Sequence, residues 1–179
     1  MGGGTLVTVI RYMVQDDPSH RDRSRTRVRA GVMSKTRVAI ASDHAGYALK
    51  AALKACLADA GHAVVDLGTD GTGSVDYPDF GYAMARAIRE GRADRGVLVC
   101  GSGIGISIAA NRYPDIRAAL VHDALGARLA RQHNDANVIC FGGRMIGEDV
   151  AGDCLRLFLE TEFEGGRHAR RIEKLSNPE

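Results

Sequence analysis

The chain has 179 residues, of which 45% are hydrophobic and 26% charged, and a net charge of +2. This length suits one domain with its own core, and the composition is that of an ordinary globular protein. It contains no apolar run near the ~20 residues of a membrane-spanning helix, and no overall basic excess that would indicate a nucleic-acid partner.

Residues 1–36 differ from the rest of the chain. They carry seven Lys and Arg against three Asp, and residues 16–27 have too little apolar surface to offset the entropy of ordering them. We expect residues 1–36 to be a disordered extension, or untranslated sequence ahead of a start at Met33. A transit peptide and a basic nucleic-acid arm are the alternatives. Residues 37–179 are expected to form a single domain that includes a basic C-terminal helix.

From residue 37 the hydrophobic pattern alternates between strand-like and helix-like segments. A strand at 38–41 precedes a helix at 47–60, whose Leu49, Leu53 and Leu57 share one face. The predicted elements that follow are a strand at 62–67, a helix from residue 77 closed by Gly91, a strand at 96–100, a helix at 104–112, a strand at 116–121, a helix to about 132, a strand at 137–141, a helix at 148–160 and a basic segment at 165–175. This order predicts a three-layer α/β/α sandwich with a five-stranded parallel sheet, Rossmann-like in its winding.

Polar residues and glycines follow four of the predicted strands: Asp43 and His44, Cys100 with the glycine loop Gly101–Gly105, His122 with Asp123, and Gly142–Arg144. Ligands bind at the carboxyl ends of parallel strands. We therefore expect these residues to converge at one edge of the sheet.

The glycine loop after Cys100 indicates an anion-binding site. Glycines let the backbone turn sharply and present its N–H groups, and the helix predicted from residue 104 directs its N-terminal dipole at the same point. A helix N-terminus also lowers the pKa of a thiol. Cys100 can therefore be a base beside a carbonyl, with the N–H groups holding the oxyanion, or a covalent nucleophile with His44, His122 or His133 as its base.

A nucleotide-binding regulatory module is the alternative from another class of protein. The glycines at 101, 103 and 105 are spaced by two, which does not fit the G-x-G-x-x-G fingerprint, and no lysine follows for a Walker loop. Asp123 does mimic the ribose-binding acid of such folds. The glycine spacing nevertheless favours acid–base chemistry.

Two polar segments near the C-terminus each allow two interpretations. His133 lies in the run Arg131-Gln-His-Asn-Asp135, which is either functional or a solvated helix end with Asn134 in a left-handed turn. Arg167 and Arg171 are four residues apart, so on a helix they share a face. That face suits a phosphate or belongs to a solvated basic tail.

From Arg37 to about Lys174 the chain resembles the type B ribose-5-phosphate isomerases, a family that also includes allose- and galactose-6-phosphate isomerases. The motifs that carry the resemblance occur in this order: Ser42-Asp-His-Ala-Gly46, Asp76-Tyr-Pro78, Cys100-Gly-Ser-Gly-Ile-Gly-Ile-Ser-Ile-Ala-Ala-Asn111, Arg131-Gln-His-Asn-Asp135, Phe141-Gly-Gly-Arg144, and Gly165-Gly-Arg-His168 with Arg171. The resemblance implies interconversion of ribose 5-phosphate and ribulose 5-phosphate through a cis-enediolate, in the pentose phosphate pathway, without metal or cofactor.

The resemblance also implies a role for each matching residue. Cys100 would move the proton between C1 and C2, because Ile106 stands where other members carry a carboxylate base. His133 would donate the proton for ring opening, and Ser102, a threonine in many members, completes the catalytic group. The backbone of Gly101, Ser102, Gly103, Ile104 and Gly105 would hold the enediolate oxygens. The other substrate-binding residues would be Asp43, His44 and Asn134 for the sugar, and Arg144, Arg167 and Arg171 for the phosphate and other polar groups.

The same resemblance implies a homodimer or tetramer whose active sites draw residues from two subunits. We expect a cytoplasmic enzyme that acts on a phosphorylated sugar and binds neither nucleic acid nor membrane. A hexose 6-phosphate in place of the pentose is the alternative within the family. Cys56, Cys140 and Cys154 lie in no metal-binding spacing, and we expect them to be small buried side chains in a reducing compartment.

Overall fold

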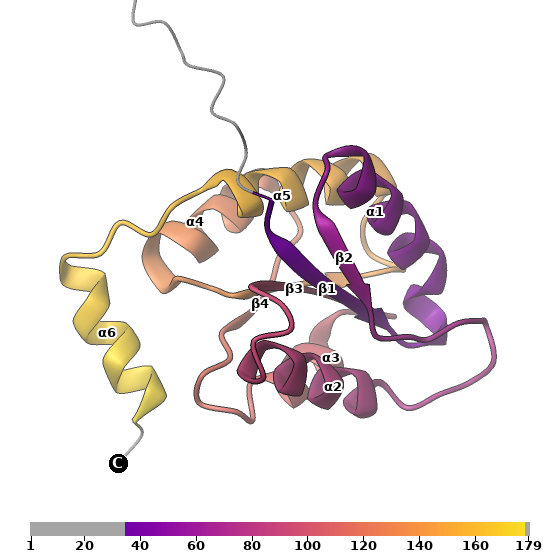
Figure 1. Cartoon of the computed structure of the whole chain (residues 1–179), viewed down its shortest axis with the longest axis horizontal. Helices are drawn as coiled ribbons and strands as arrows, with labels where there is room; N and C mark the ends of the chain where they lie inside the picture. The colour runs from indigo at the N-terminus through magenta and orange to yellow at the C-terminus, as the bar shows by residue number, and fades with distance from the viewer. Residues whose placement is uncertain (1–34, 178–179) are drawn as a thin grey trace, which may run out of the picture. The chain divides into compact units, whose positions relative to one another are not determined.

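The computed structural model of the chain describes residues 35–177 (Figure 1). Our expectation for the N-terminal extension therefore falls almost wholly outside the described residues, and the domain boundary at residue 37 stays a prediction. Ser34–Glu179 forms one compact unit. Its elements are β1 (Arg37–Ser42), a 3-10 turn η1 (His44–Gly46), α1 (Tyr47–Asp59), β2 (Ala63–Asp66), α2 (Tyr77–Arg89), β3 (Arg95–Cys100), α3 (Ile104–Ala110), β4 (Ala118–Leu120), α4 (Ala124–Asn134), β5 (Val138–Gly142), α5 (Glu148–Glu160) and α6 (Arg167–Ser176).

The five strands form one parallel sheet in the order β2-β1-β3-β5-β4. Helices α1, α4 and α5 cover one face, and α2 and α3 cover the other (Figure 1). Alternate residues of each central strand supply the two cores. In β1, Val38 and Ile40 face the first set of helices, and Ala39 and Ala41 face the second. The predicted three-layer sandwich is confirmed.

Helix α1 shows how the pattern produces this packing. Leu49, Leu53 and Leu57 are 5%, 0% and 1% exposed, and all three lie in the core between α1 and the sheet. Burial of each leucine contributes about 2 kcal/mol relative to leaving it in water. From residue 54 to residue 60, Leu57 alone is buried. Our expectation that Cys56 is buried is therefore wrong: its thiol is exposed on α1.

Helix α4 ends differently from our expectation. It extends through Asn134, and the left-handed residue is Asp135, with φ 42°, not Asn134 as the interpretation of a solvated helix end requires. The carboxylate of Asp135 accepts hydrogen bonds from Arg131 and Arg117, each at 2.7 Å. These two bonds stabilise a conformation that Asp tolerates better than most residues.

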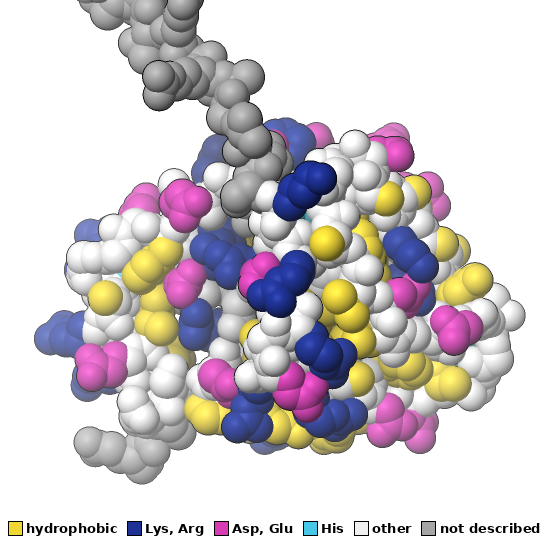
Figure 2. Space-filling view, viewed as in Figure 1, with side chains coloured by type: hydrophobic (Ala, Val, Ile, Leu, Met, Phe, Trp, Pro, Cys, Tyr) yellow, Lys and Arg dark blue, Asp and Glu magenta, His cyan; other side chains and the backbone are white. Residues whose placement is uncertain are grey.

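No helix in the described part of the chain is long and apolar enough to cross a membrane. On the face shown in Figure 2, Lys and Arg side chains are interspersed with Asp and Glu. That face therefore offers no single-sign field of the kind that attracts a nucleic acid.

Candidate active site

A cavity of about 400 Å³ lies at the carboxyl ends of β1, β3 and β5. Its lining residues are Asp43, Tyr77, Cys100, Gly101, Ser102, Gly105, Arg144 and Met145. The fold thus gathers the residues that follow three different strands into one site. His122 and Asp123 do not line it. The Asp123 carboxylate instead caps α4 by accepting from the Gly126 amide at 2.7 Å.

Cys100 ends β3 with its side chain almost fully buried, at 4% exposed. The Gly103 amide donates a hydrogen bond to the Cys100 Sγ at 3.1 Å. The next amide, that of Ile104, donates to the Ser102 hydroxyl at 3.3 Å. The loop therefore holds the sulfur and the hydroxyl against its own backbone.

Glycine is required at two positions of this loop. Gly103 has φ 76°, in the left-handed region, and a Cβ there would lie 2.8 Å from the Phe141 carbonyl carbon. A Cβ on Gly105 would lie 2.6 Å from the Tyr77 ring. The turn around Cys100 can close only because these two side chains are absent.

Asp43 places a second polar group in the cavity. It is 6% exposed, and its Oδ1 accepts from the amides of Ala45 and Gly46 at 2.9 and 3.0 Å. These bonds fix the carboxylate at the start of η1. Asp43 is thereby held in place where it lines the cavity.

Arg144 brings a positive charge to the same cavity. Its amide donates to the Gly101 carbonyl at 3.1 Å, and its guanidinium lies close enough to Gly101 that an added Cβ would be 3.5 Å from it. The end of β5 is thereby tied to the glycine loop. A thiol, a carboxylate, a hydroxyl and a guanidinium share one small space.

His44 lies next to these residues but does not line the cavity. Its Nδ1 accepts a hydrogen bond from the Val75 amide at 3.3 Å. That bond requires Nδ1 to be unprotonated, so the neutral ring carries its hydrogen on Nε2. His44 therefore presents a donor at its far nitrogen.

The remaining predicted residues, His133, Asn134, Arg167 and Arg171, do not line the Cys100 cavity. His133 and Asn134 form the last turn of α4, and the two arginines lie on α6. The His133 ring stacks on that of His168, with centroids 4.4 Å apart. Glu164 Oε2 lies 3.9 Å from His133 Nε2 and 3.8 Å from His168 Nε2.

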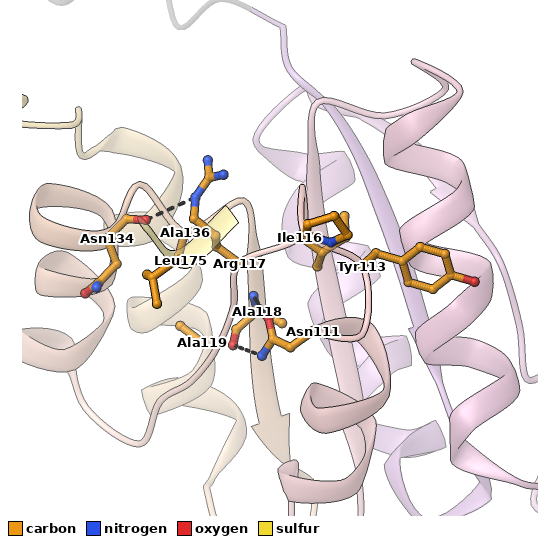
Figure 3. A pocket seen from close by; sticks show the side chains of 10 residues that line it. Asn111, Tyr113, Ile116, Arg117, Ala118, Ala119, Asn134, Ala136 and Leu175 are labelled. Atoms are coloured by element: carbon orange, nitrogen blue, oxygen red, sulfur yellow. Dashed lines mark hydrogen bonds between the residues drawn. The ribbon is translucent and has the colours of Figure 1, made fainter. Parts of the chain in front are cut away.

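Asn134 lines a second cavity, of about 330 Å³, beside the edge strand β4 (Figure 3). The side chain of Asn111 accepts from the Ala118 amide and donates to the Ala118 carbonyl, as a neighbouring strand would. Arg117 Nε donates to the Asn134 carbonyl at 3.1 Å. The Asn111 bonds thus satisfy the edge of β4 at Ala118, and the Arg117 bond holds the end of α4.

Four residues at or near these sites received no role from the sequence. Tyr77 and Met145 line the Cys100 cavity, while Glu164 and His168 contact His133. Tyr77 and His168 belong to two of the motifs that the chain shares with the isomerase family, and this could have indicated a role for them. No sequence motif marked Met145 or Glu164, because their positions at these sites result from packing between segments that are distant in the chain.

The two thiols of this region differ. Burial raises the pKa of Cys140 far above its ordinary value, and the neighbouring Cys100 adds to the effect. Cys140 therefore stays a neutral thiol in the core, whereas Cys100 faces the cavity and receives an amide hydrogen bond.

His133, Glu164 and His168 bring three potential metal-ligand atoms within 4.8 Å of one another. The two imidazole planes are only 6° from parallel. Their nitrogen lone pairs consequently run side by side and do not point to a common centre. The cluster is arranged for ring stacking, and we assign no metal to it.

Comparison with known proteins agrees with this geometry. The family model described as Ribose/Galactose Isomerase matches residues 38–175. Ribose-5-phosphate isomerase B of Escherichia coli (strain K12) is 41% identical over 78% of this chain and 94% of its own. D-erythrulose-4-phosphate isomerase of Pectobacterium atrosepticum is 42% identical over 77% and 91%. The crystal structure of a ribose 5-phosphate isomerase from Thermotoga maritima has a TM-score of 0.78 and 49% identity over 79% and 97%. The chain belongs to the ribose/galactose isomerase family.

Proposed function

We propose that this chain interconverts ribose 5-phosphate and ribulose 5-phosphate in the pentose phosphate pathway, with Cys100 as the base. The observation that carries the proposal is the Cys100 sulfur at the cavity wall, held by the Gly103 amide at 3.1 Å. The relatives named as ribose-5-phosphate isomerases support the substrate class. No group beyond those of the protein and the sugar is needed.

The reaction moves one proton along the open-chain sugar. The Cys100 thiolate removes the C2 proton, the C2–H electrons form the C1–C2 double bond, and the C1–O1 π electrons move onto O1. The resulting enediolate is stabilised by the Ser102 hydroxyl and by the loop amides other than those of Gly103 and Ile104, which donate to Cys100 and Ser102. The O2 hydroxyl then passes its proton to O1, the thiol returns its proton to C1, and the electrons left on O2 form the C2 carbonyl of the ketone. Proton transfer and oxyanion stabilisation each contribute roughly 10² to 10⁴ in rate.

We propose that Asp43 Oδ2 and His44 hydrogen-bond the sugar, and that Arg144 binds a polar end of the substrate. The fixed Asp43 carboxylate and the Nε2 donor of His44 support these roles, since neither group has to reorganise when the sugar arrives. A cavity of about 400 Å³ accommodates a sugar phosphate of this size.

We further propose that His133, Asn134, Arg167 and Arg171 act in the site of a second subunit of a homodimer or tetramer. Their separation from the Cys100 cavity of the same chain supports this. The helix that starts at the site, α3, also exposes Ile104 and Ile108 at 53% and 50%. These side chains are one turn apart and offer an apolar face for a second copy.

A cytoplasmic location fits the four cysteines, none of which forms a disulfide. The deciding experiment measures kcat/KM of the purified chain for ribose 5-phosphate, allose 6-phosphate and galactose 6-phosphate. We expect a clear preference for the pentose. A preference for a hexose would replace the proposed substrate. Absence of isomerase activity together with dinucleotide binding would overturn the proposal.

A further inference from the structure

The ring of His168 is a buried platform beneath His133. His168 is 5% exposed, and its imidazole lies parallel to that of His133, with centroids 4.4 Å apart and planes 6° from parallel. The two residues come from different helices, α6 and α4. Stacking of this kind restricts the plane of the more exposed ring, which here is His133.

His168 is a neutral member of this pair. Arg167 Nε donates a hydrogen bond to His168 Nε2 at 3.3 Å, and only an unprotonated nitrogen accepts such a bond. Burial lowers the pKa of His168, as do the positive charges of His133, Arg167 and Arg171, against the opposing effect of Glu164. His168 is therefore the uncharged platform of the pair, and the ring free to take part in proton transfer is that of His133.

Glu164 is the carboxylate that faces the His133 ring. Its Oε2 lies 3.9 Å from His133 Nε2, within ion-pair distance. Its amide donates to the Gln132 carbonyl at 3.1 Å, so the segment before α6 is tied to the last turn of α4. Because His168 Nε2 already accepts from Arg167, the N–H available to Glu164 in this pair belongs to His133.

We propose that His168 and Glu164 are positioning residues for ring opening: His168 fixes the plane of the His133 imidazole, and Glu164 stabilises its protonated form. The inference rests on the proposed function, in which His133 opens the furanose. In that step His133 transfers its proton to the ring oxygen O4, the C1–O4 bond electrons pass to O4, and the O1 hydroxyl releases its proton to water. The product is the open-chain aldehyde that Cys100 then isomerises.

Substrate choice separates ring opening from isomerisation. Ribose 5-phosphate closes a five-membered ring through O4. Erythrose 4-phosphate cannot, because its O4 carries the phosphate, so it reaches the enzyme without a ring to open. The family includes a relative named for a tetrose phosphate. Loss of the positioning residues should therefore impair turnover of the pentose and spare that of the tetrose.

The experiment compares His168→Ala, His168→Phe and Glu164→Gln with wild type on both substrates. Glu162→Gln, an exposed carboxylate two residues from Glu164, is the matched control. With ribose 5-phosphate we expect His168→Ala and Glu164→Gln to lower kcat by about tenfold or more, with KM within about twofold. His168→Phe keeps a flat ring and should retain most of the activity. Glu162→Gln should match wild type.

With erythrose 4-phosphate all four variants should stay within about twofold of wild type, whereas Cys100→Ala should be inactive on both sugars. In Glu164→Gln the alkaline limb of kcat/KM for the pentose should move to lower pH, because the carboxylate no longer stabilises the protonated ring. The charged groups that face the pair, Arg167 and Arg171, are unchanged in this variant.

Equal losses on both sugars would show a merely structural role and overturn the inference, as would full activity of His168→Ala on the pentose. If wild type does not turn over the tetrose, two other measurements test the inference: the pH profile of Glu164→Gln, and the recovery of activity in His168→Phe relative to His168→Ala. The inference would be rejected if the alkaline limb of kcat/KM for Glu164→Gln stayed where it is in wild type. It would also be rejected if His168→Phe were as impaired as His168→Ala. A wild type without isomerase activity on any sugar phosphate would instead reject the proposed function.

Discussion

The Gly103 amide donates a 3.1 Å hydrogen bond to the sulfur of Cys100, three residues earlier in the chain. The bond forms because β3 ends at Cys100 and Gly103 turns the chain back with φ 76°. This backbone donor holds the sulfur in place at the cavity wall. The local geometry thus links a strand end, a glycine turn and a reactive group.

Replacement of Cys100 by Ala should lower kcat for ribose 5-phosphate by about 10² or more, because the base is removed while the cavity remains. KM should change little. Cys56→Ala is the matched control, since that thiol is exposed on α1, and it should leave turnover intact. Steady-state kinetics of the three proteins make the comparison. Substantial activity in Cys100→Ala would show that another group is the base.

Gly103→Ala should both destabilise the protein and lower kcat. The added methyl meets the Phe141 backbone, and an L side chain at this φ costs about 1–2 kcal/mol per residue. Gly152→Ala is the control: it lies within α5 with open space around its Cα, and should gain about 0.5–1 kcal/mol. Urea unfolding and kinetics test both. A Gly103→Ala protein with wild-type stability would contradict this account of the loop.

If two subunits share each site, inactive variants should complement one another. Cys100→Ala and His133→Ala, refolded together in equal amounts, should recover roughly a quarter of wild-type activity, since random pairing leaves one intact site in each mixed dimer. Each variant refolded alone supplies the baseline. A mixture no more active than its components would place both residues in the same subunit's site.

Asp66 is predicted to stabilise the fold in a pH-dependent way. Burial raises its pKa, but the hydrogen bonds donated by Lys50 and Lys54 outweigh burial, and the net pKa lies below the ordinary 3.8. Stability from a lowered carboxyl pKa is present above the unfolded-state value and is lost as pH falls through the folded-state value. At pH 7, Asp66→Asn should cost about 2 kcal/mol, because it leaves the ammonium of buried Lys50 without its charged partner.

Urea unfolding at pH 7 and near pH 3 checks this prediction. The difference in the free energy of unfolding between wild type and Asp66→Asn should be smaller at the lower pH. Asp94→Asn is the control, because its ion pair with Arg37 is exposed on both sides, and pairs of that kind contribute little. If the difference in unfolding free energy did not change with pH, the loss of stability in Asp66→Asn would come from packing and not from charge.

Much of the candidate site followed from local pattern. Asp43, the loop after Cys100 and Arg144 could be placed at one sheet edge because each follows a strand whose direction the α/β alternation sets. That reasoning failed for His122 and Asp123, which follow β4 but do not line the Cys100 cavity. Local pattern also failed to predict the exposure of Cys56 and the left-handed turn at Asp135. Burial at the end of α1 and the turn after α4 depend on partners elsewhere in the chain, such as Arg117, which lies 18 residues before Asp135.

The sequence by itself determined the layered fold, the edge that carries the site and the glycine loop at Cys100, because hydrophobic period and glycine position act over a few residues. The tertiary structure alone decided which distant side chains meet. It separates His133 from the Cys100 cavity and places it on His168, 35 residues further along the chain. That contact depends on how α6 packs on α4, which no local pattern encodes.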